Sequence, residues 1–172
     1  MALDIVFYGG KQAGAICLLS LLARGESVKL AIAQDDIVEQ VAGAFRIPCA
    51  PPKILDLHKN DGKLAQGQVD LFVCAHGKKI VGAKILAAHR LGGINVHPCL
   101  WKYKGADPVS RLLADKGAKA SVGVHRMTSK VDSGEVLSEI FTDVSGCGTV
   151  LEIYNALYPL YAIALNSALD SL

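Results

Sequence analysis

The stretch that decides the fold class is Leu-Asp-Ile-Val-Phe-Tyr-Gly-Gly-Lys-Gln-Ala-Gly-Ala-Ile-Cys-Leu-Leu-Ser-Leu-Leu-Ala-Arg-Gly-Glu-Ser-Val-Lys-Leu-Ala-Ile-Ala, residues 3–33. Its first six residues form a short apolar run that predicts a buried strand, which Gly9 and Gly10 end. Residues 13–24 then predict an apolar helix that stops at Gly25, and residues 28–33 predict a second strand. Strand, helix and strand in this order are typical of a parallel sheet with helices on both faces.

The rest of the chain continues this alternation. Thr149 and Glu152 have the spacing of a capping box at the start of the last helix, and Pro159 is expected to kink or divide that helix. Residues 51–68 predict loops around one short helix. Further strands are expected over 70–74, 94–97, 120–126 and 135–141, and further helices from Asp35 or Asp36 to about Phe45, over 82–90 and over 108–116. The predicted fold is a single Rossmann-like α/β domain over residues 1–172, with a mostly parallel sheet.

The composition limits the classes of function. Of the 172 residues, 51% are hydrophobic and 20% are charged, which excludes a globally disordered chain. The formal net charge of +2 is too small to indicate nucleic-acid or membrane binding by itself. The longest apolar run, residues 13–23, is shorter than the roughly 20 residues of a membrane span, and the N-terminus resembles no signal peptide. Five scattered cysteines without a C-x-x-C pair indicate free thiols, so a cytoplasmic protein without a membrane partner is expected.

The most informative short motif is Gly-Ile-Asn-Val-His-Pro, residues 93–98. In an extended strand, Asn95 and His97 point to the same side, just before Pro98 ends the strand. The carboxyl ends of strands are where open α/β sheets bind ligands, and an amide beside an imidazole suits a developing oxyanion. From the residues alone, a structural role for two polar groups at a strand end is the alternative.

A second polar stretch, residues 128–135, contains Asp132 before a turn with a glycine. This carboxylate could approach His97 in the fold, whereas an ordinary Asx-turn is the alternative. Metal binding is not expected, because the pairs Cys74-x-His76 and His97-x-Cys99 lack a second pair that would complete a zinc site. The loop at residues 9–14 matches neither the dinucleotide nor the P-loop motif, which leaves a tight turn or a substrate-contacting loop.

Two blocks of sequence resemble the 10-formyltetrahydrofolate-dependent formyltransferases. They are residues 93–100 with 103–108, and Val-His-Arg-Met-Thr at 124–128 leading to Val-Asp-Ser-Gly at 131–134. The resemblance implies formyl transfer to a primary amine, with Asn95, His97 and Asp132 as catalytic residues and no metal. It also implies a folate pocket between the loop at residues 75–81 and the loop that carries the aspartate. The implied cofactor-binding positions are Lys78, Lys79, Ile80, Val81, Thr128 and Val131.

The acceptor is less well defined by the sequence. An aromatic side chain beside lysines could stack on a base and pair with a phosphate, or simply pack; the expected substrate positions are Tyr8, Gly10, Lys11, Trp101, Lys102, Tyr103 and Lys104. The segment 99–102 is one residue shorter than the family pattern and lacks its proline, and the serine-rich phosphate loop of the glycinamide ribonucleotide enzymes is absent. The chain ends at Leu172, which argues against tRNA and favours a small amine, such as an amino sugar nucleotide. A homo-oligomer is left open.

Three alternatives remain at this point. The same residues could activate water and hydrolyse formyltetrahydrofolate. Cys99 beside His97 could serve as a thiol nucleophile. The chain could also be a non-catalytic folate or nucleotide-binding module. His125 matches the family pattern but lies within an expected strand, so it is interpreted as a core histidine.

Overall fold

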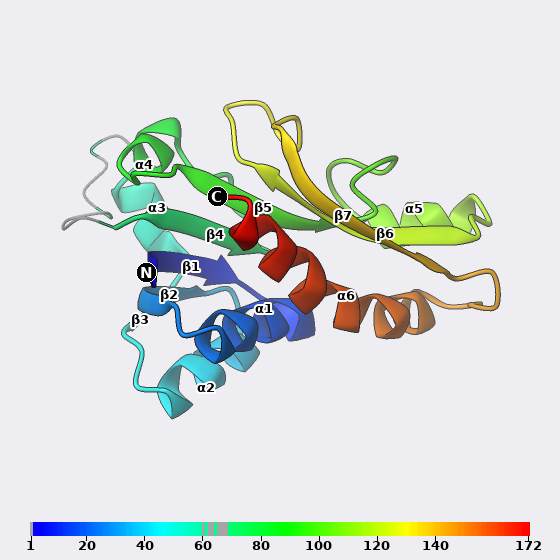
Figure 1. Cartoon of the computed structure of the whole chain (residues 1–172), viewed down its shortest axis with the longest axis horizontal. Coiled ribbons are helices and arrows are strands. Elements are labelled where there is room, and N and C mark those ends of the chain that lie inside the picture. The colour runs from blue at the N-terminus through cyan, green and yellow to red at the C-terminus, as the bar shows by residue number, and fades with distance from the viewer. Residues whose placement is uncertain (1, 60, 62–63, 65–68) are drawn as a thin grey trace.

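A twisted sheet forms the centre of the protein (Figure 1). The computed structural model describes residues 2–59, 61, 64 and 69–172. Within these residues the sheet has seven strands in the order β3-β2-β1-β4-β5-β6-β7. The first five are parallel and the last two are added antiparallel. The strands are β1 Asp4–Gly9, β2 Ser27–Ala33, β3 Cys49–Ala50, β4 Leu71–Ala75, β5 Gly93–Pro98, β6 Lys119–Arg126 and β7 Val136–Asp143.

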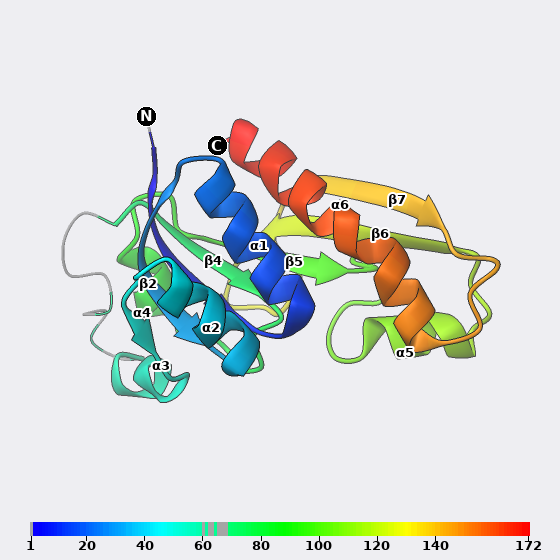
Figure 2. The same cartoon turned by 90° about the horizontal axis from the view of Figure 1, so that it is seen from below.

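Helices cover both faces of this sheet, which confirms the predicted α/β class. They are α1 Lys11–Ala23, α2 Asp36–Ala44, α3 Lys53–Leu57, α4 Ala83–Ala87, α5 Pro108–Ala114 and α6 Val150–Asp170. Alternate residues of β1 point to opposite faces: Ile5 and Phe7 pack with α1, α2 and α6, whereas Val6 and Tyr8 pack with α3 and α4. Figure 2 shows α1 and α6 side by side over one face.

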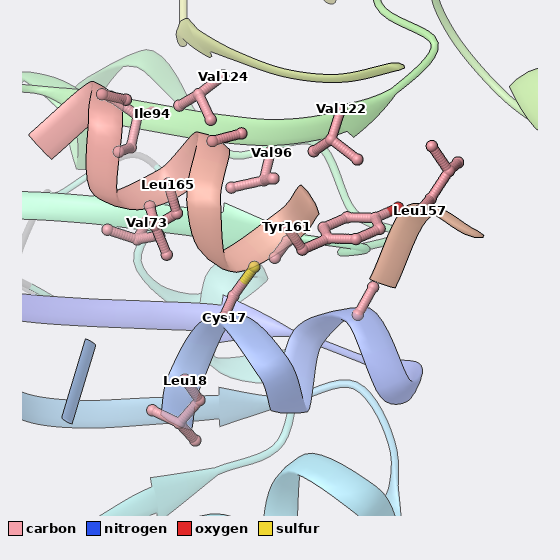
Figure 3. Close-up of a cluster of buried hydrophobic side chains, with 14 of the residues drawn as sticks. Cys17, Leu18, Val73, Ile94, Val96, Val122, Val124, Leu157, Tyr161 and Leu165 are labelled. Carbon is pink, nitrogen blue, oxygen red and sulfur yellow. The ribbon is translucent and has the colours of Figure 1, made fainter. Parts of the chain in front are cut away.

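The larger core lies between α1, α6 and the middle of the sheet (Figure 3). Leu157, Tyr161 and Leu165 follow one another at helical spacing on α6 and are fully buried. They face apolar side chains of β4, β5 and β6. Cys17 of α1 packs in the same cluster, from the helix beside α6. This packing fixes the strands whose ends carry the functional groups.

The last helix differs from the sequence expectation. Its capping box is present, because Thr149 Oγ1 accepts the Glu152 N–H at 3.2 Å and the Glu152 carboxylate accepts the Thr149 N–H at 3.0 Å. Of the kink or division predicted at Pro159, the division does not occur, since α6 is continuous. Pro159 is exposed, and so is Asn155, whose carbonyl loses its helical partner and can turn to water. The buried residues on both sides of Pro159 then hold the helix together.

In the middle of the chain, α3 is the one short helix expected over 51–68; residues 60, 62–63 and 65–68 of that range lie outside the described residues. The strand β3 was not expected, and it is only two residues long. The five cysteines, all in the described part, are free thiols. Within the described ranges, no helix combines the length and apolar character that crossing a bilayer requires.

Candidate active site

A cleft of about 430 Å³ opens at the carboxyl ends of β4 and β5. One wall is the loop that follows β4, and another is the loop between β6 and β7. The segment that precedes α5 closes a third side, and Lys11 of α1 and Tyr154 of α6 complete the lining. This is the position at which open α/β sheets bind ligands, and the volume lies within the usual range of about 300–1,000 Å³ for small-molecule sites.

Asn95 and His97 both line this cleft, as their period-two spacing on β5 predicts. His97 Nε2 lies 3.1 Å from Asp132 Oδ2 and 3.1 Å from the carbonyl oxygen of Gly105. Since a carboxylate and a carbonyl can only accept hydrogen bonds, Nε2 carries a proton. Its other nitrogen, Nδ1, is buried and has no hydrogen-bond partner among the described residues. The imidazole is therefore held in place through Nε2, and its two acceptors require a proton on that nitrogen.

The carboxylate of Asp132 contacts the other polar groups of the site. Its Oδ1 lies 3.3 Å from Asn95 Nδ2 and 3.2 Å from His125 Nε2, and its Oδ2 accepts the Gly105 N–H at 2.7 Å. The structure thus brings together the three residues that the sequence proposed as catalytic. The carboxylate is only 8% exposed. Burial alone would raise the pKa of Asp132, but hydrogen bonds from His125, His97 and the Gly105 amide outweigh it and lower that pKa well below its usual range.

His125 is the residue of this site that the sequence analysis placed elsewhere. It is buried, as a core histidine would be, but its Nε2 contacts Asp132 and its Nδ1 lies 2.8 Å from the carbonyl oxygen of Arg126. In the antiparallel pair of β5 and β6, His125 is directly opposite Asn95. That register is a property of the folded sheet, so the motif Val-His-Arg-Met-Thr was the only signal available in the sequence.

Gly134 allows the loop that carries Asp132 to fold against β6. A Cβ at this position would lie 1.8 Å from the carbonyl oxygen of Arg126, in a segment where the Arg126 N–H also bonds to the Glu135 carbonyl. We expect Gly134→Ala to destabilise the protein by about 3 kcal/mol because backbone must move. The midpoint of thermal unfolding should fall by roughly 10 °C. Gly146→Ala is the control, since its Cβ would meet no atom within 4 Å. Equal midpoints for the two variants would contradict this reading.

The six positions implied for folate binding all lie on the wall of the cleft. Four are in the loop after β4 and two in the loop before β7: Lys78, Lys79, Ile80, Val81, Thr128 and Val131. Ile80 and Val131 are large apolar residues that are 76% and 56% exposed. Lys79 forms an ion pair with Asp56 of α3. The two loops therefore present apolar and backbone groups to the space between them.

Tyr8 does not line the cleft but holds the first of these loops in place. It is fully buried, and its hydroxyl oxygen accepts the N–H groups of Lys78 and Lys79, each at 2.9 Å. The hydroxyl in turn donates to Gln34 Oε1 at 2.7 Å. A Cβ at Gly77 would lie 2.2 Å from the Tyr8 ring, so only glycine fits beneath it. The expected direct contact of Tyr8 with substrate is thus replaced by support of the loop.

Of the other expected substrate positions, only Lys11 lines the cleft; Gly10, Trp101, Lys102, Tyr103 and Lys104 do not. The chain turns sharply at Cys99, where φ is +54°, and carries Trp101 towards β7. There the indole packs edge-on against Phe141, with ring centroids 6.2 Å apart. Tyr103 is buried and donates its hydroxyl to Asp115 at 2.9 Å. The turn therefore directs residues 101–104 away from the cleft, and its lining does not include them.

Cys99 does not have the character of a nucleophile. Its side chain is fully buried, and burial raises the pKa of its thiol. A reactive cysteine needs a lowered pKa and an accessible sulfur. Within the described ranges, no group of three His, Cys, Asp or Glu residues is arranged to hold a metal ion.

His76, in the loop after β4, is a titratable group on the floor of the cleft. Its Nε2 lies 2.7 Å from the Tyr161 hydroxyl, and burial together with the nearby charges of Lys11 and His97 lowers its pKa from 6.5 to about 4. Because the unfolded chain takes up a proton at higher pH than the folded one, this residue reduces stability as the pH falls from 6.5 towards 4.

Urea unfolding at about pH 7 and about pH 5 tests this effect. The free energy of unfolding should fall more between these two pH values in the wild type than in His76→Gln, which cannot take up the proton. Parallel pH dependence in the two proteins would exclude the assignment.

Comparison with known proteins assigns the chain to a family. The formyl transferase profile matches residues 8–169. The methionyl-tRNA formyltransferase of Stutzerimonas stutzeri is 30% identical over 183 residues, which cover 99% of this chain and 58% of that protein. The chain spans 46–58% of the length of such relatives.

Solved structures support the fold. A phosphoribosylglycinamide formyltransferase from Anaplasma phagocytophilum superposes with a TM-score of 0.83 at 17% identity, over 99% of this chain and 86% of that one. A formyltetrahydrofolate deformylase from Pseudomonas syringae superposes with a TM-score of 0.82 at 16% identity, over 98% and 60% of the two chains. At these identities the likeness concerns the fold alone.

The relatives also correct one expectation. The position of Leu172 was taken to argue against tRNA, but the curated relatives are named methionyl-tRNA formyltransferases. That inference is wrong, because the last residue of the chain carries no information about the acceptor. The family itself is clear from the profile, which covers nearly all of the sequence. The chain therefore belongs to the formyl transferase family.

Proposed function

We propose that this cleft transfers the formyl group of 10-formyltetrahydrofolate to a primary amine. The observation that carries the proposal is the convergence of Asn95, His97 and Asp132 on one another at the end of β5, within a single cleft. Membership of the formyl transferase family supports the same chemistry. The amine attacks the formyl carbon of the bound donor, the bond between that carbon and the folate nitrogen breaks, and the proton that the amine loses ends on that nitrogen.

Asn95 and His97 face the point at which negative charge develops on the formyl oxygen. The amide donates a hydrogen bond there, and the imidazole, which Asp132 holds through Nε2–H, donates a second hydrogen bond or a proton from Nδ1 when both of its nitrogens carry protons. Asp132 fixes His97 through Oδ2 and takes part in removing a proton from the attacking nitrogen. Its lowered pKa keeps it ionised at neutral pH, so its negative charge orients His97 and stabilises positive charge on that imidazole when a proton passes through it.

His125 is a positioning residue in this scheme. Its Nδ1 is directed at the carbonyl of Arg126, so its Nε2 is fixed beside both Asp132 and Asn95. From the neighbouring strand β6 it limits the rotation of the carboxylate and the amide. Because His125 holds the Asp132 carboxylate and the Asn95 amide in place, these groups lose little conformational freedom when the reaction begins.

The walls fit a folate donor. A flat heteroaromatic ring needs apolar contacts on its faces and backbone hydrogen-bonding groups at its edges. The exposed side chains of Ile80 and Val131 lie on two different loops of the cleft, and residues 78–81 line the wall that the first loop forms. Lys78 and Lys130 at the rim provide positive charge for the carboxylates of the donor's tail.

The test is incubation of the full chain with 10-formyltetrahydrofolate and a panel of amines. The panel contains an amino sugar nucleotide, glycinamide ribonucleotide and charged methionyl-tRNA. We expect tetrahydrofolate and a formylated amine in equal amounts, followed by absorbance and product mass. Release of formate without an amine would instead indicate hydrolysis. Folate binding without turnover on any amine would indicate a binding module, and both results contradict the proposal.

A further inference from the structure

The outer side of the helix pair α1 and α6 carries almost no charge. The two helices lie side by side over one face of the sheet (Figure 2). Residues 12–23 of α1 and residues 153–169 of α6 contain no Asp, Glu, Lys or Arg. A helix that borders water normally carries charged side chains on that side, whereas a helix without them is normally buried. The composition of both helices is therefore that of a covered surface.

Large apolar side chains lie on this outer side. Leu19 of α1 is 42% exposed, and Ile163 and Leu151 of α6 are 51% and 65% exposed. They belong to two stripes of exposed or half-buried residues at helical spacing, which we call the α1/α6 face: Gln12, Ile16, Leu19 and Ala23 on α1, and Leu151, Asn155, Pro159, Ile163 and Ser167 on α6. Apolar residues that stay exposed across two neighbouring helices indicate an interaction surface.

The helices α1 and α6 run in the same direction. Ser20 Oγ of α1 donates to Asn166 Oδ1 of α6 at 3.2 Å. Four residues further along both helices, Arg24 Nη2 donates to Asp170 Oδ1 at 2.6 Å. Since the two contacts have the same spacing on each helix, the helices are parallel and in step over this length.

The charges at the ends of the two helices are opposite in sign. Lys11 and Arg24 are the basic residues at the ends of α1, and Glu152 and Asp170 are the acidic residues at the ends of α6. A two-fold axis parallel to the helices places α1 of each copy on α6 of the other, so that basic ends meet acidic ends. An axis across the helices would set α1 on α1 and α6 on α6, with like charges opposed. The first arrangement makes the α1/α6 face complementary to itself, as a symmetric dimer requires.

The α1/α6 face is large enough for such a pair. With 21 residues α6 is about 31 Å long, and with 13 residues α1 is about 20 Å long. Because each helix is about 10 Å wide, the two helices cover roughly 500 Å² on each copy, or about 1,000 Å² on two copies. This reaches the area of about 1,000 Å² that a specific protein–protein interface needs.

We propose that two copies of this chain associate through their α1/α6 faces, related by a two-fold axis parallel to the helices. The inference goes beyond the proposed function and does not depend on it. A lipid surface suits this face less well, because helices that lie on membranes are rich in Lys and Arg on their polar side, whereas the ends of α6 are acidic. In the pair, Leu19 of one copy lies near Ile163 of the other, since the two positions differ by about two residues, or roughly 3 Å, along the parallel helices.

Sedimentation equilibrium of the full chain at increasing concentration tests this pairing. The wild type should form a species of twice the chain mass of 18.2 kDa. Leu19→Lys and Ile163→Glu should each raise the dissociation constant by about tenfold or more, because each places an unpaired charge in the interface. The variant with both changes should regain most of the wild-type affinity, since opposite charges then meet across the two copies.

The control is Leu57→Lys, which adds the same charge at an exposed position of α3, on the other face of the sheet. It should leave the dissociation constant unchanged. Because all the substituted side chains are exposed, circular dichroism should show each variant folded like the wild type.

A wild type that stays monomeric up to about 1 mM would overturn the inference, and so would single variants that associate as tightly as the wild type. Binding of the monomer to phosphatidylcholine vesicles, in place of self-association, would assign the face to a lipid surface and equally overturn it. A double variant that associates no more tightly than the single variants would overturn the stated axis, since α1 would then not face α6.

Discussion

Replacing Asp132 with asparagine is expected to lower kcat for formyl transfer by about 10³-fold or more while the protein remains folded. The carboxylate of Asp132 accepts from four donors: His97, His125, Asn95 and the Gly105 amide. An asparagine side chain carries an NH₂ group where one of these oxygens stood, so at least one donor would face another donor. The imidazole of His97 would then lose the contact that orients it.

The fold should tolerate this change for a local reason. Asp132 lies in the left-handed region, with φ +47°, and asparagine adopts this conformation as readily as aspartate. The measurement is the rate of tetrahydrofolate appearance with the best amine of the panel, together with circular dichroism and thermal unfolding. Asp36→Asn, an exposed carboxylate of α2, is the control. Full turnover in folded Asp132→Asn would remove the basis of the mechanism.

The second large effect is expected for Asn95→Ala, which should lower kcat by about 10²–10³-fold. The amide donates to charge that exists only in the transition state, so KM for the donor should change little. Asn95 also contacts Asp132 and His125, and its removal leaves the carboxylate with three donors. Steady-state kinetics at several donor concentrations separate kcat from KM.

Gln40→Ala provides the matched loss of an exposed amide on α2, away from the cleft. It should behave as the wild type in both parameters. If Asn95→Ala instead raised KM and kept kcat, Asn95 would be a binding residue, and the oxyanion would need another donor. The sum of the effects of Asn95→Ala and Asp132→Asn should also exceed the effect of the double variant, because the two side chains act as one unit.

The sequence predicted those parts of the site that depend on local geometry. Asn95 and His97 share a face because strand residues alternate, and this required no knowledge of the tertiary structure. The pairing of Asp132 with His97 depends on how the loop after β6 returns to β5, which the family motif indicated and spacing did not. The role of His125 could not be predicted from spacing, because its position opposite Asn95 is set by the register of the antiparallel strands β5 and β6.

Local propensity also misled at particular residues. Tyr8 and Tyr103 have the polar tips of ligand-binding side chains, but in the fold their hydroxyls serve the loop at 78–79 and Asp115. Pro159 was expected to kink or divide α6, yet the helix is not divided, and buried residues lie on both sides of the proline. In each case tertiary packing outweighed the preference of a single residue, and such packing cannot be read from neighbours in the chain.

The phenol of Tyr8 has a consequence for how a donor binds. Two successive amides of the loop after β4 are already bonded to a side chain of β1, a strand inside the sheet. The entropy lost in ordering these residues is therefore paid when the chain folds, and not when a ligand arrives. The loop after β4 is therefore preorganised: although its backbone is irregular, its hydrogen bonds to Tyr8 attach it to the sheet.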